Sequence, residues 1–543
     1  MISGKNCWSL SLQWGMSMHP MSGKELYTFD DMAPSLYHQL AQAASSNPQK
    51  IAVVDDWGRP TTYERLLSLT DDFAAYLASE KGLGHGSLIA LLMHADLEFV
   101  VSFYAISKLG AVCIPIPTKY REREVASLLD IAKPSAVIAG EEFEGWASSF
   151  PVGPEMCIWS RGVGHGYGFN RVCGYAHASS NGSGSATDPA VMMFTSGTTS
   201  AAKGVVLKNY NLVFATMIYQ RLMGTTPEDS CLVPIPIYHV TGLVALMAQF
   251  IYVGGTIYLH RRFDARRVLE CIRDERITYL HGSPTSFAEL IPLRPEFPSL
   301  PTVRVMLSGS SYEPVSKMRV FHEWMPTATF QVVYGMTETS SPALLFPWDS
   351  ATSIYAGATG KPVPGVDAVL LDEDQHEVPE GEVGELALRG TCVTEGYFHH
   401  NSSDLLPGGW LLTGDMGYAN GEGMIWIVDR KKDMINRGGE KVWCSALEEV
   451  LCEIPGISEA CACGMPDDLY GEVPVAVCVR QTGSNLTEGE IKTALKSRLA
   501  HFKIPVHIAF ANEIPQTRGE KPDRRAALGL VLQSLTEETS RKA

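Results

Sequence analysis

The sequence predicts an α/β protein with a large amino-terminal domain of layered α/β subdomains, a β-rich subdomain within it, and a small α+β carboxy-terminal domain. Its 543 residues exceed one ordinary hydrophobic core, so we expect at least two domains. Helical patterns alternate with short runs of β-branched residues, which is typical of buried, mostly parallel strands covered by helices. A change of pattern near residues 428–433 marks the start of the smaller domain.

These patterns place the elements in order along the chain. In the first part we expect helices over residues 34–44, 62–80 and 99–109, and strands over 88–93 and 111–116. A Ser- and Gly-rich connector over 178–188 precedes a strand over 190–194, and strand–helix units follow over 255–272 and 279–293. Short strands over 382–388, 396–398 and 410–413 form the β-rich subdomain, and helices over 445–453 and 487–499 belong to the last domain.

Composition narrows the class of protein. Hydrophobic residues make up 45% of the chain and charged residues 19%, which is typical of a folded soluble enzyme. The net charge of −16 counts against general nucleic-acid binding. The 12 cysteines are scattered without a CxxC pair, so we expect reduced thiols, a cytoplasmic location and no cysteine metal site.

Three segments bear on targeting and membrane insertion. Residues 1–21 lack the charged and apolar regions of a signal peptide, so we expect a poorly ordered tail or residues upstream of the true start. The apolar run 231–259 is broken by prolines and glycines, which favours strand, loop, buried helix and strand over a membrane span. The last residues are not the peroxisomal Ser-Lys-Leu signal.

The run from Met193 to Gly204 predicts a phosphate-binding loop. Its hydroxyls, glycine amides and lysine can all donate to phosphate oxygens. It is not the P-loop of NTPases, because Ala202 replaces the second glycine and Gly204 replaces the hydroxyl residue. A polar hairpin between two apolar runs is the alternative. The candidate phosphate ligands are Thr195, Ser196, Gly197, Thr198, Thr199 and Lys203.

Four further motifs follow in order along the chain. They are Tyr334-Gly335-Met336-Thr337-Glu338, Leu412-Thr413-Gly414-Asp415, Asp429-Arg430-Lys431-Lys432-Asp433, and Pro515-Gln516-Thr517 with Lys521 close behind. With the phosphate loop, their order and spacing resemble the ANL superfamily of adenylate-forming enzymes, the AMP-dependent synthetases and ligases. The chain is most similar to the acyl- and aryl-CoA synthetases of that superfamily, from about Pro34 to about Leu530.

The resemblance implies a two-step reaction and a mobile last domain. ATP with Mg²⁺ would activate a carboxylic acid to an acyl-adenylate, and CoA would then accept the acyl group as a thioester, as in fatty acid metabolism. The resemblance places the adenylating domain over residues 22–428, a hinge over 429–433 at Lys432, and the carboxy-terminal domain over 434–543. It implies small-molecule partners, with no nucleic acid and no membrane span.

The resemblance also gives roles to individual residues. Lys521 would stabilise charge between the carboxylate and the α-phosphate, and Glu338 would bind Mg²⁺. Asp415 and Arg430 would hold the ribose. Taken singly, Lys521 could instead be a surface lysine and Thr337 could cap a helix. The other expected ATP ligands are Ser310, Ser311, Tyr334, Gly335, Met336 and Thr337, and the expected CoA contacts are Gly438, Gly439 and Lys441.

His239 bears on the substrate. A lone histidine among apolar residues is more often a satisfied core side chain. In the resembling CoA synthetases an aromatic–His pair such as Tyr238-His239 lies at the acyl pocket and belongs to the catalytic site. Without an acid beside it, an α-amino acid would bury an uncompensated ammonium, so we expect an acid with an apolar body. The candidate pocket walls are Val240, Thr241, Ser308, Gly309, Pro342 and Ala343.

Three other functions stay open at this point, and one of them is an oxidation like that of the beetle luciferases in the same superfamily. The chain could load the phosphopantetheine arm of a separate carrier protein, because it has no carrier domain of its own. It could also be a non-catalytic nucleotide-binding relative, because four positions depart from the superfamily pattern. These positions are Ser200, Cys444, Ala446 and Glu520.

Overall fold

The computed structural model of the protein describes residues 1–160, 184–195, 202–399, 404–517 and 521–542. The chain forms two compact units. Unit 1 contains residues 1–368 and 388–411, and unit 2 contains residues 369–387 and 412–543. The hinge predicted over residues 429–433 lies inside unit 2, where the Ser445 amide donates to the Asp429 carboxylate and the Ser445 hydroxyl donates to the Val428 carbonyl.

A nine-stranded sheet forms the larger layer of unit 1. In sheet order its strands are β18 (Lys361–Pro362), β17 (Leu344–Leu345), β16 (Thr329–Tyr334), β15 (Val305–Ser308), β14 (Tyr279–Gly282), β12 (Ser230–Val233), β13 (Thr256–Leu259), β4 (Ile51–Val54) and β5 (Pro60–Thr62). The strands from β16 to β4 are parallel, and both edges are antiparallel. Parallel strands place the residues that follow them at one edge of the sheet.

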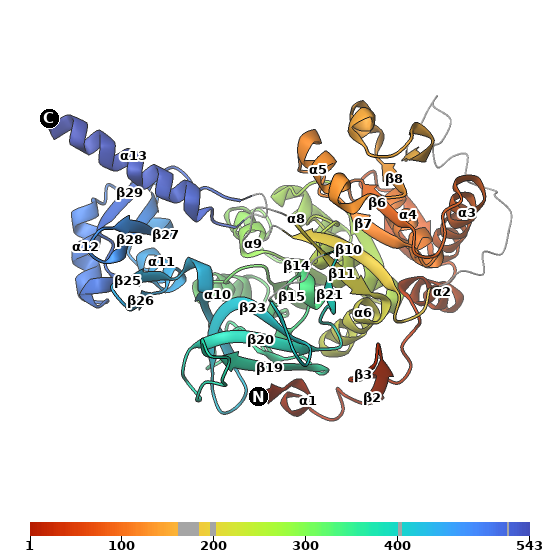
Figure 1. Cartoon of the computed structure of the whole chain (residues 1–543), viewed down its shortest axis with the longest axis horizontal. Coiled ribbons are helices and arrows are strands. Elements are labelled where there is room, and N and C mark those ends of the chain that lie inside the picture. The colour runs from red at the N-terminus through yellow and green to blue at the C-terminus, as the bar shows by residue number, and fades with distance from the viewer. Residues whose placement is uncertain (161–183, 196–201, 400–403, 518–520, 543) are drawn as a thin grey trace. The chain divides into compact units, whose positions relative to one another are not determined.

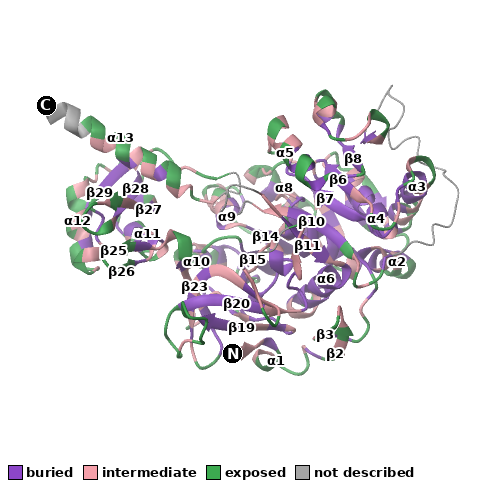
Figure 2. Ribbon diagram, in the orientation of Figure 1, coloured by how far each residue is buried: buried purple, intermediate pink, exposed green. Residues whose placement is uncertain are grey.

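A seven-stranded sheet forms the second layer of unit 1. In order its strands are β21 (Gly396–Tyr397), β11 (Lys203–Lys208), β10 (Pro189–Thr195), β7 (Val112–Pro115), β6 (Leu88–Leu92), β8 (Ala136–Ala139) and β9 (Cys157–Trp159). The pairs from β10 to β9 are parallel, while β10, β11 and β21 pair antiparallel. Buried aliphatic residues of these strands form a continuous core with the helix after β7. Figure 2 shows the strands of both sheets mostly buried, as expected for covered parallel sheets.

Helices connect and cover these sheets (Figure 1). They are α1 (Gly4–Cys7), α2 (Leu36–Ser46), α3 (Tyr63–Lys81), α4 (Leu97–Lys108), α5 (Glu122–Ala132), α6 (Asn209–Met223), α7 (Gln249–Val253), α8 (Ala265–Asp274), α9 (Pro284–Leu290) and α10 (Val315–Trp324). The helix predicted over 62–80 is confirmed as α3, because the Thr62 hydroxyl caps its first turn and Gly82 ends it with a φ of 63°. The run 231–259 is also as predicted, with β12, a π-helical segment Thr241–Ala248, α7 and β13.

The first 21 residues differ from the poorly ordered tail that the sequence predicted. Strand β1 (Ile2–Ser3) pairs with β19 (Val366–Leu371), and β2 (Met16–Met21) pairs with β3 (Lys24–Phe29). The indole of Trp8 donates to the Pro362 carbonyl at 2.7 Å. The partners of β1 and Trp8 lie more than 350 residues further along the chain, so local sequence gives no sign of them, whereas β2 and β3 form a local hairpin that the sequence analysis missed.

The predicted β-rich subdomain is present, but the strand predicted over 396–398 does not belong to it, because this strand is β21 and pairs with β11 in the seven-stranded sheet. Its sheet continues from β1 and β19 through β20 (Gly384–Gly390) and β23 (Trp410–Ala419) to β22 (Leu405–Leu406), and β24 (Ile425–Arg430) pairs with β23. The boundary between the two units runs through β19, β20 and β23.

Unit 2 ends in an α+β fold. Its sheet has the strands β26 (Glu440–Val442), β25 (Ile435–Arg437), β28 (Gly471–Arg480) and β27 (Ile457–Asp467), with β29 (His507–Ala511) pairing with β28. Alternate residues of β27 and β28 pack either against α11 (Cys444–Cys452) and α12 (Glu488–Lys496) or against α13 (Arg524–Lys542). Helices therefore cover both faces of the sheet.

Candidate active site

Most predicted site residues of unit 1 follow the carboxyl ends of neighbouring parallel strands. Ser308 ends β15 and pairs in register with Gly282 of β14 and Val332 of β16. Tyr334 ends β16, two residues beyond that register. Ligands of open α/β sheets bind at this edge, so the fold gathers the expected adenine and phosphate residues where a nucleotide fits.

The phosphate loop joins two paired strands. Thr195 ends β10, Lys203 begins β11, and the two residues are opposite each other in the antiparallel pair. The two strands therefore pair as the alternative prediction of a hairpin expected. A hairpin and a phosphate-binding role for the residues that join the strands do not exclude each other. Four predicted ligands, Ser196, Gly197, Thr198 and Thr199, lie outside the described residues.

Lys203 has a defined environment. Its ammonium lies 3.0 Å from the Asp404 carboxylate and 5.4 Å from the centre of the Tyr397 ring. The Tyr397 hydroxyl donates to Glu338 Oε1 at 3.3 Å. Tyr397 therefore contacts both Lys203 and Glu338, and the sequence analysis missed both Tyr397 and Asp404.

Glu338 lies in a 3-10 helix, Thr337–Thr339, directly after β16, and is 7% exposed. Burial raises the pKa of its carboxyl group above the usual range, and the hydrogen bond from Tyr397 partly offsets this. Among the residues that the structure describes, no group of three or more His, Cys, Asp or Glu side chains could hold a metal. A single carboxylate fits Mg²⁺ that arrives with phosphate and water ligands, because this ion is bound through one or two carboxylates in such sites.

The turn before Glu338 is tightly built. A Cβ on Gly335 would lie 1.3 Å from the Ser341 carbonyl oxygen, so only glycine fits there. The Met336 amide donates to the Thr339 hydroxyl at 3.0 Å. The serines that follow, Ser340 and Ser341, have φ values of 55° and 104°. This packing fixes the positions of Tyr334, Met336 and Thr337, which are all half-buried.

The segment after β15 is partly buried and partly exposed. Ser308 is fully buried and donates to the Glu313 carboxylate at 2.6 Å. Gly309 is also buried, and a Cβ there would lie 3.0 Å from the Val333 carbonyl oxygen. Ser310, with a φ of 78°, and Ser311 are exposed. The last two are therefore accessible to a ligand at the sheet edge.

His239 is exposed, which excludes a buried core histidine. Its ring lies 4.9 Å from the ring of Tyr238, which is 6% exposed. The chain turns closely here, because a Cβ on Gly242 would lie 2.5 Å from the Pro236 carbonyl oxygen. The other predicted pocket residues are mostly covered: Val240, Pro342 and Ala343 are buried and Thr241 is half-buried.

In unit 2, three predicted residues come together. Asp415 of β23 and Arg430 of β24 are opposite each other, with Arg430 Nε 3.3 Å from Asp415 Oδ1. Lys521 lies near both, and its pKa is lowered to about 8 by burial and by the positive charge of Arg430, with Asp415 acting in the opposite direction. A surface lysine would keep its usual pKa. Lys432, the expected hinge residue, is exposed in the 3-10 helix Lys431–Asp433.

The expected CoA residues form the hairpin between β25 and β26. Gly438 and Gly439 have φ values of 60° and 96°, which a two-residue hairpin turn requires. The Gly438 amide donates to the Tyr470 carbonyl at 2.8 Å, and Lys441 is exposed. The turn therefore presents backbone without side chains.

A cationic cavity of about 520 Å³ in unit 1 was missed by the sequence analysis. Arg261 lies 2.6 Å from Glu142, and Arg267 lies 3.0 Å from Asp56. The cationic and aromatic side chains that line the cavity are Lys119, Arg121, Arg261, Arg262, Arg267, Tyr120, Phe143 and Trp146. The arginine pairs at 261–262 and 266–267 were the available signal, but their aromatic partners lie more than 100 residues earlier.

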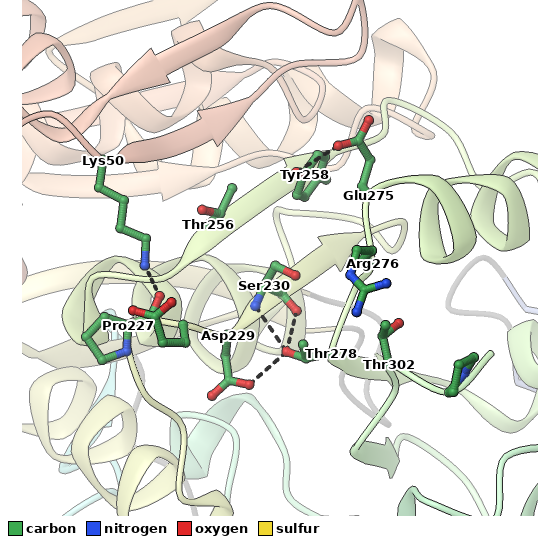
Figure 3. A pocket seen from close by; sticks show the side chains of 12 residues that line it. Lys50, Pro227, Asp229, Ser230, Thr256, Tyr258, Glu275, Arg276, Thr278 and Thr302 are labelled. Carbon is green, nitrogen blue, oxygen red and sulfur yellow. Dashed lines mark hydrogen bonds between the residues drawn. The ribbon is translucent and has the colours of Figure 1, made fainter.

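Another cavity, of about 530 Å³, lies at the opposite edge of the nine-stranded sheet. Figure 3 shows Ser230, Thr256 and Thr278, at the amino ends of β12, β13 and β14, with the Lys50 side chain directed to Pro227. None of the predicted site residues lines this cavity.

Comparisons with known proteins cover nearly the whole chain. The family model for AMP-binding enzymes matches residues 40–398, and the model for the AMP-binding enzyme C-terminal domain matches residues 446–521. An indoleacetate–CoA ligase from Aromatoleum aromaticum is 30% identical over 473 residues, which is 84% of this chain and 91% of that protein.

Solved structures of other proteins have the same fold as this chain. ATP-bound MatB from Rhodopseudomonas palustris superposes with a TM-score of 0.82 and 25% identity, covering 91% of this chain and 97% of that one. An o-succinylbenzoate CoA synthetase from Bacillus subtilis, bound to its acyl-adenylate, superposes with a TM-score of 0.80 and is 26% identical. The match covers 91% of this chain and 98% of that one. The structure of the same synthetase with ATP and magnesium ion has a TM-score of 0.79 and 25% identity, and the match covers 92% of this chain and 100% of that one.

The fold and these matches define an adenylate-forming enzyme. The chain belongs to the AMP-binding enzyme family. The predicted superfamily, the α/β fold class and the class of acid–thiol ligase are confirmed. Among the described residues, no helix is both long and apolar enough to cross a membrane.

Proposed function

We propose that this enzyme activates a carboxylic acid with an apolar, aryl or fatty body and transfers it to CoA. The observation that carries the proposal is the placement of Lys521 beside Asp415 and Arg430, which gives a half-buried ammonium next to groups suited to a ribose. The enzyme uses ATP with Mg²⁺, and CoA is its second substrate.

The reaction proceeds in two displacements. A carboxylate oxygen attacks the α-phosphate of ATP, the bond between the α- and β-phosphates breaks, and pyrophosphate leaves. The CoA thiol then attacks the acyl carbon, loses its proton, and displaces AMP. Both steps depend mainly on positioning and on neutralising negative charge.

The protein supplies that charge from fixed positions. Lys521 stabilises charge shared by the attacking carboxylate and the α-phosphate, and Lys203 with the loop from Thr195 holds the departing pyrophosphate. Glu338 would hold Mg²⁺ through its carboxylate, and the ion would supply positive charge that neutralises the phosphates. Tyr334 stacks on the adenine, and Thr337 donates to the α-phosphate.

The acyl group lies against the aromatic–His pair and the edge of the nine-stranded sheet. The exposed ring of His239 can contact a ligand, and half-buried Thr241 lies two residues further along the chain, whereas Val240, Gly309 and Ala343 are buried behind them. These residues favour an uncharged acyl body, because a buried ammonium would need a carboxylate partner.

The cationic cavity would hold the nucleotide end of CoA. Five cationic side chains against two acidic ones attract phosphates despite the net charge of −16 of the whole chain. The tryptophan, tyrosine and phenylalanine of the cavity offer faces for adenine. The glycine hairpin at Gly438 and Gly439, with Lys441, would contact the pantetheine arm.

We retain the hinge at Lys432, with the adenylating domain over 22–428 and the mobile domain over 434–543. Exposed Lys432 in a short 3-10 helix can change its backbone angles at low cost. The scattered free cysteines support a cytoplasmic location.

Pyrophosphate release across a panel of apolar acids, with and without CoA, tests the function. We expect acid-dependent release and a CoA thioester as product. Thioester formation on a carrier protein but not on CoA would favour a carrier-loading enzyme. Failure of every acid to release pyrophosphate would favour a non-catalytic relative.

A charge-removing substitution tests the CoA cavity. Arg262→Gln should raise the KM for CoA about three- to tenfold, because one ion pair to phosphate is lost, and leave CoA-independent adenylation unchanged. Arg266→Gln is the matched control, since its partner is exposed Glu296 and it does not line the cavity. Equal KM values for the two variants would contradict the assignment.

A further inference from the structure

The lysine that we assign to pyrophosphate already has an acidic partner. Lys203 Nζ lies 3.0 Å from Asp404 Oδ2, and the lysine side chain is 17% exposed while that of Asp404 is 41% exposed. The Tyr397 ring lies against the same ammonium. Lys203 is therefore held toward Asp404 in this structure by a contact that phosphate would have to replace.

Asp404 also acts on the carboxylate assigned to Mg²⁺. The Glu338 carboxylate lies within the influence of the negative charge of Asp404 and the positive charge of Lys203. The Tyr397 hydroxyl links the lysine side of the cluster to Glu338 Oε1. These four side chains come from β11, the turn after β16, β21 and the segment before β22, so they form one charged cluster within unit 1.

We propose that Asp404 is a positioning residue that competes with pyrophosphate for Lys203. The inference rests on the proposed role of Lys203 as a phosphate ligand. When ATP binds, the ammonium exchanges Asp404 for a phosphate oxygen, and the ion pair with Asp404 forms again as pyrophosphate leaves. Asp404 thus weakens the hold on the leaving product, because its charge both occupies the lysine and repels phosphate.

Asp404→Asn tests the competition directly, since it keeps the side-chain size and removes the charge. Calorimetric titration with magnesium pyrophosphate should give a Kd about two- to fivefold lower than that of the wild type, the range expected for one partly exposed ion pair. Asp404→Glu should restore the wild-type value. In a Lys203→Met background, Asp404→Asn should change the Kd much less, because the contested ammonium is gone.

A matched control lies on the same strand. Lys208, at the other end of β11, pairs with the half-buried carboxylate of Glu395. Glu395→Gln removes a comparable charge and should leave the pyrophosphate Kd unchanged. Simple structural damage would weaken binding, so tighter binding in Asp404→Asn alone identifies competition.

An unchanged or higher Kd in Asp404→Asn overturns the inference. A higher Kd would mean that Asp404 serves the bound metal. The proposed function and the competition at Lys203 can fail separately. If Asp404→Asn binds pyrophosphate more tightly but no acid causes the enzyme to release pyrophosphate from ATP, only the acid-activating function is contradicted. Acid-dependent release with an unaltered Kd in Asp404→Asn would contradict the competition only.

Discussion

Raising the pH above about 8 should progressively slow the adenylation step while leaving thioester formation active. The group responsible is Lys521, whose pKa falls from its usual value of 10.5 to about 8. Burial is the largest cause, and the charges of Arg430 and Lys432 lower the pKa further, while Asp415 and Asp433 raise it. The shift corresponds to about 3 kcal/mol less stabilisation of the ammonium than in water.

The sign follows from the role of the ammonium. The charged form of Lys521 stabilises the anionic transition state, so activity is present below the pKa and is lost as the pH rises above it. The value of kcat/KM for ATP reports the free enzyme and should fall about tenfold per pH unit above 8. Pyrophosphate release at low ATP measures it.

An arginine variant gives the control. Arginine stays charged well above pH 10, so Lys521→Arg should show a flat profile between pH 7 and 10 whatever its absolute rate. Thioester formation from supplied acyl-adenylate should not fall above pH 8 in either protein, because deprotonation of the CoA thiol favours its attack. The same break in Lys521→Arg, or a flat wild-type profile, would refute the assignment.

Three further predictions follow from packing and charge. Arg524→Met leaves the largely buried Glu448 carboxylate without its partner and should lower the free energy of unfolding by about 3 kcal/mol, measured by denaturant titration; a loss below about 1 kcal/mol would contradict this. Gly335→Ala should reduce acid-dependent ATP–pyrophosphate exchange about 100-fold, because the added carbon shifts the turn. Gly396→Ala is the control and should have little effect, because there is open space around its added carbon. Similar exchange rates in the two variants would exclude a packing requirement at Gly335. Glu338→Gln should raise the Mg²⁺ concentration for half-maximal exchange about tenfold, and an unchanged requirement would mean that another group binds the metal.

Features with local signals were predicted well. Thr62 and Gly82 delimit α3 because capping hydroxyls and left-handed glycines act within one turn. The strands and buried helical segments of the apolar run 231–259 were also predicted correctly, because its prolines and glycines interrupt a continuous helix. The motif order along the chain was enough to predict the family.

Features that depend on distant partners could not be predicted. Strand β1 pairs with β19 across about 365 residues, so residues 1–21 read as an unstructured tail. The Lys203–Asp404 pair joins positions about 200 residues apart, and a lone aspartate in a loop carries no signal of its partner. The burial that lowers the pKa of Lys521 likewise arises from the folded chain and not from its motif.

Formation of an acyl-adenylate on this enzyme and transfer of its acyl group to CoA can both be followed in one single-turnover experiment. The experiment uses ATP labelled in the α-phosphate and an apolar aryl acid, with CoA first withheld and then added. We predict a labelled acyl-adenylate bound to the enzyme, which becomes labelled AMP and an equal amount of acyl-CoA when CoA is added. Labelled ADP as product, or an adenylate that CoA does not discharge, would contradict the account.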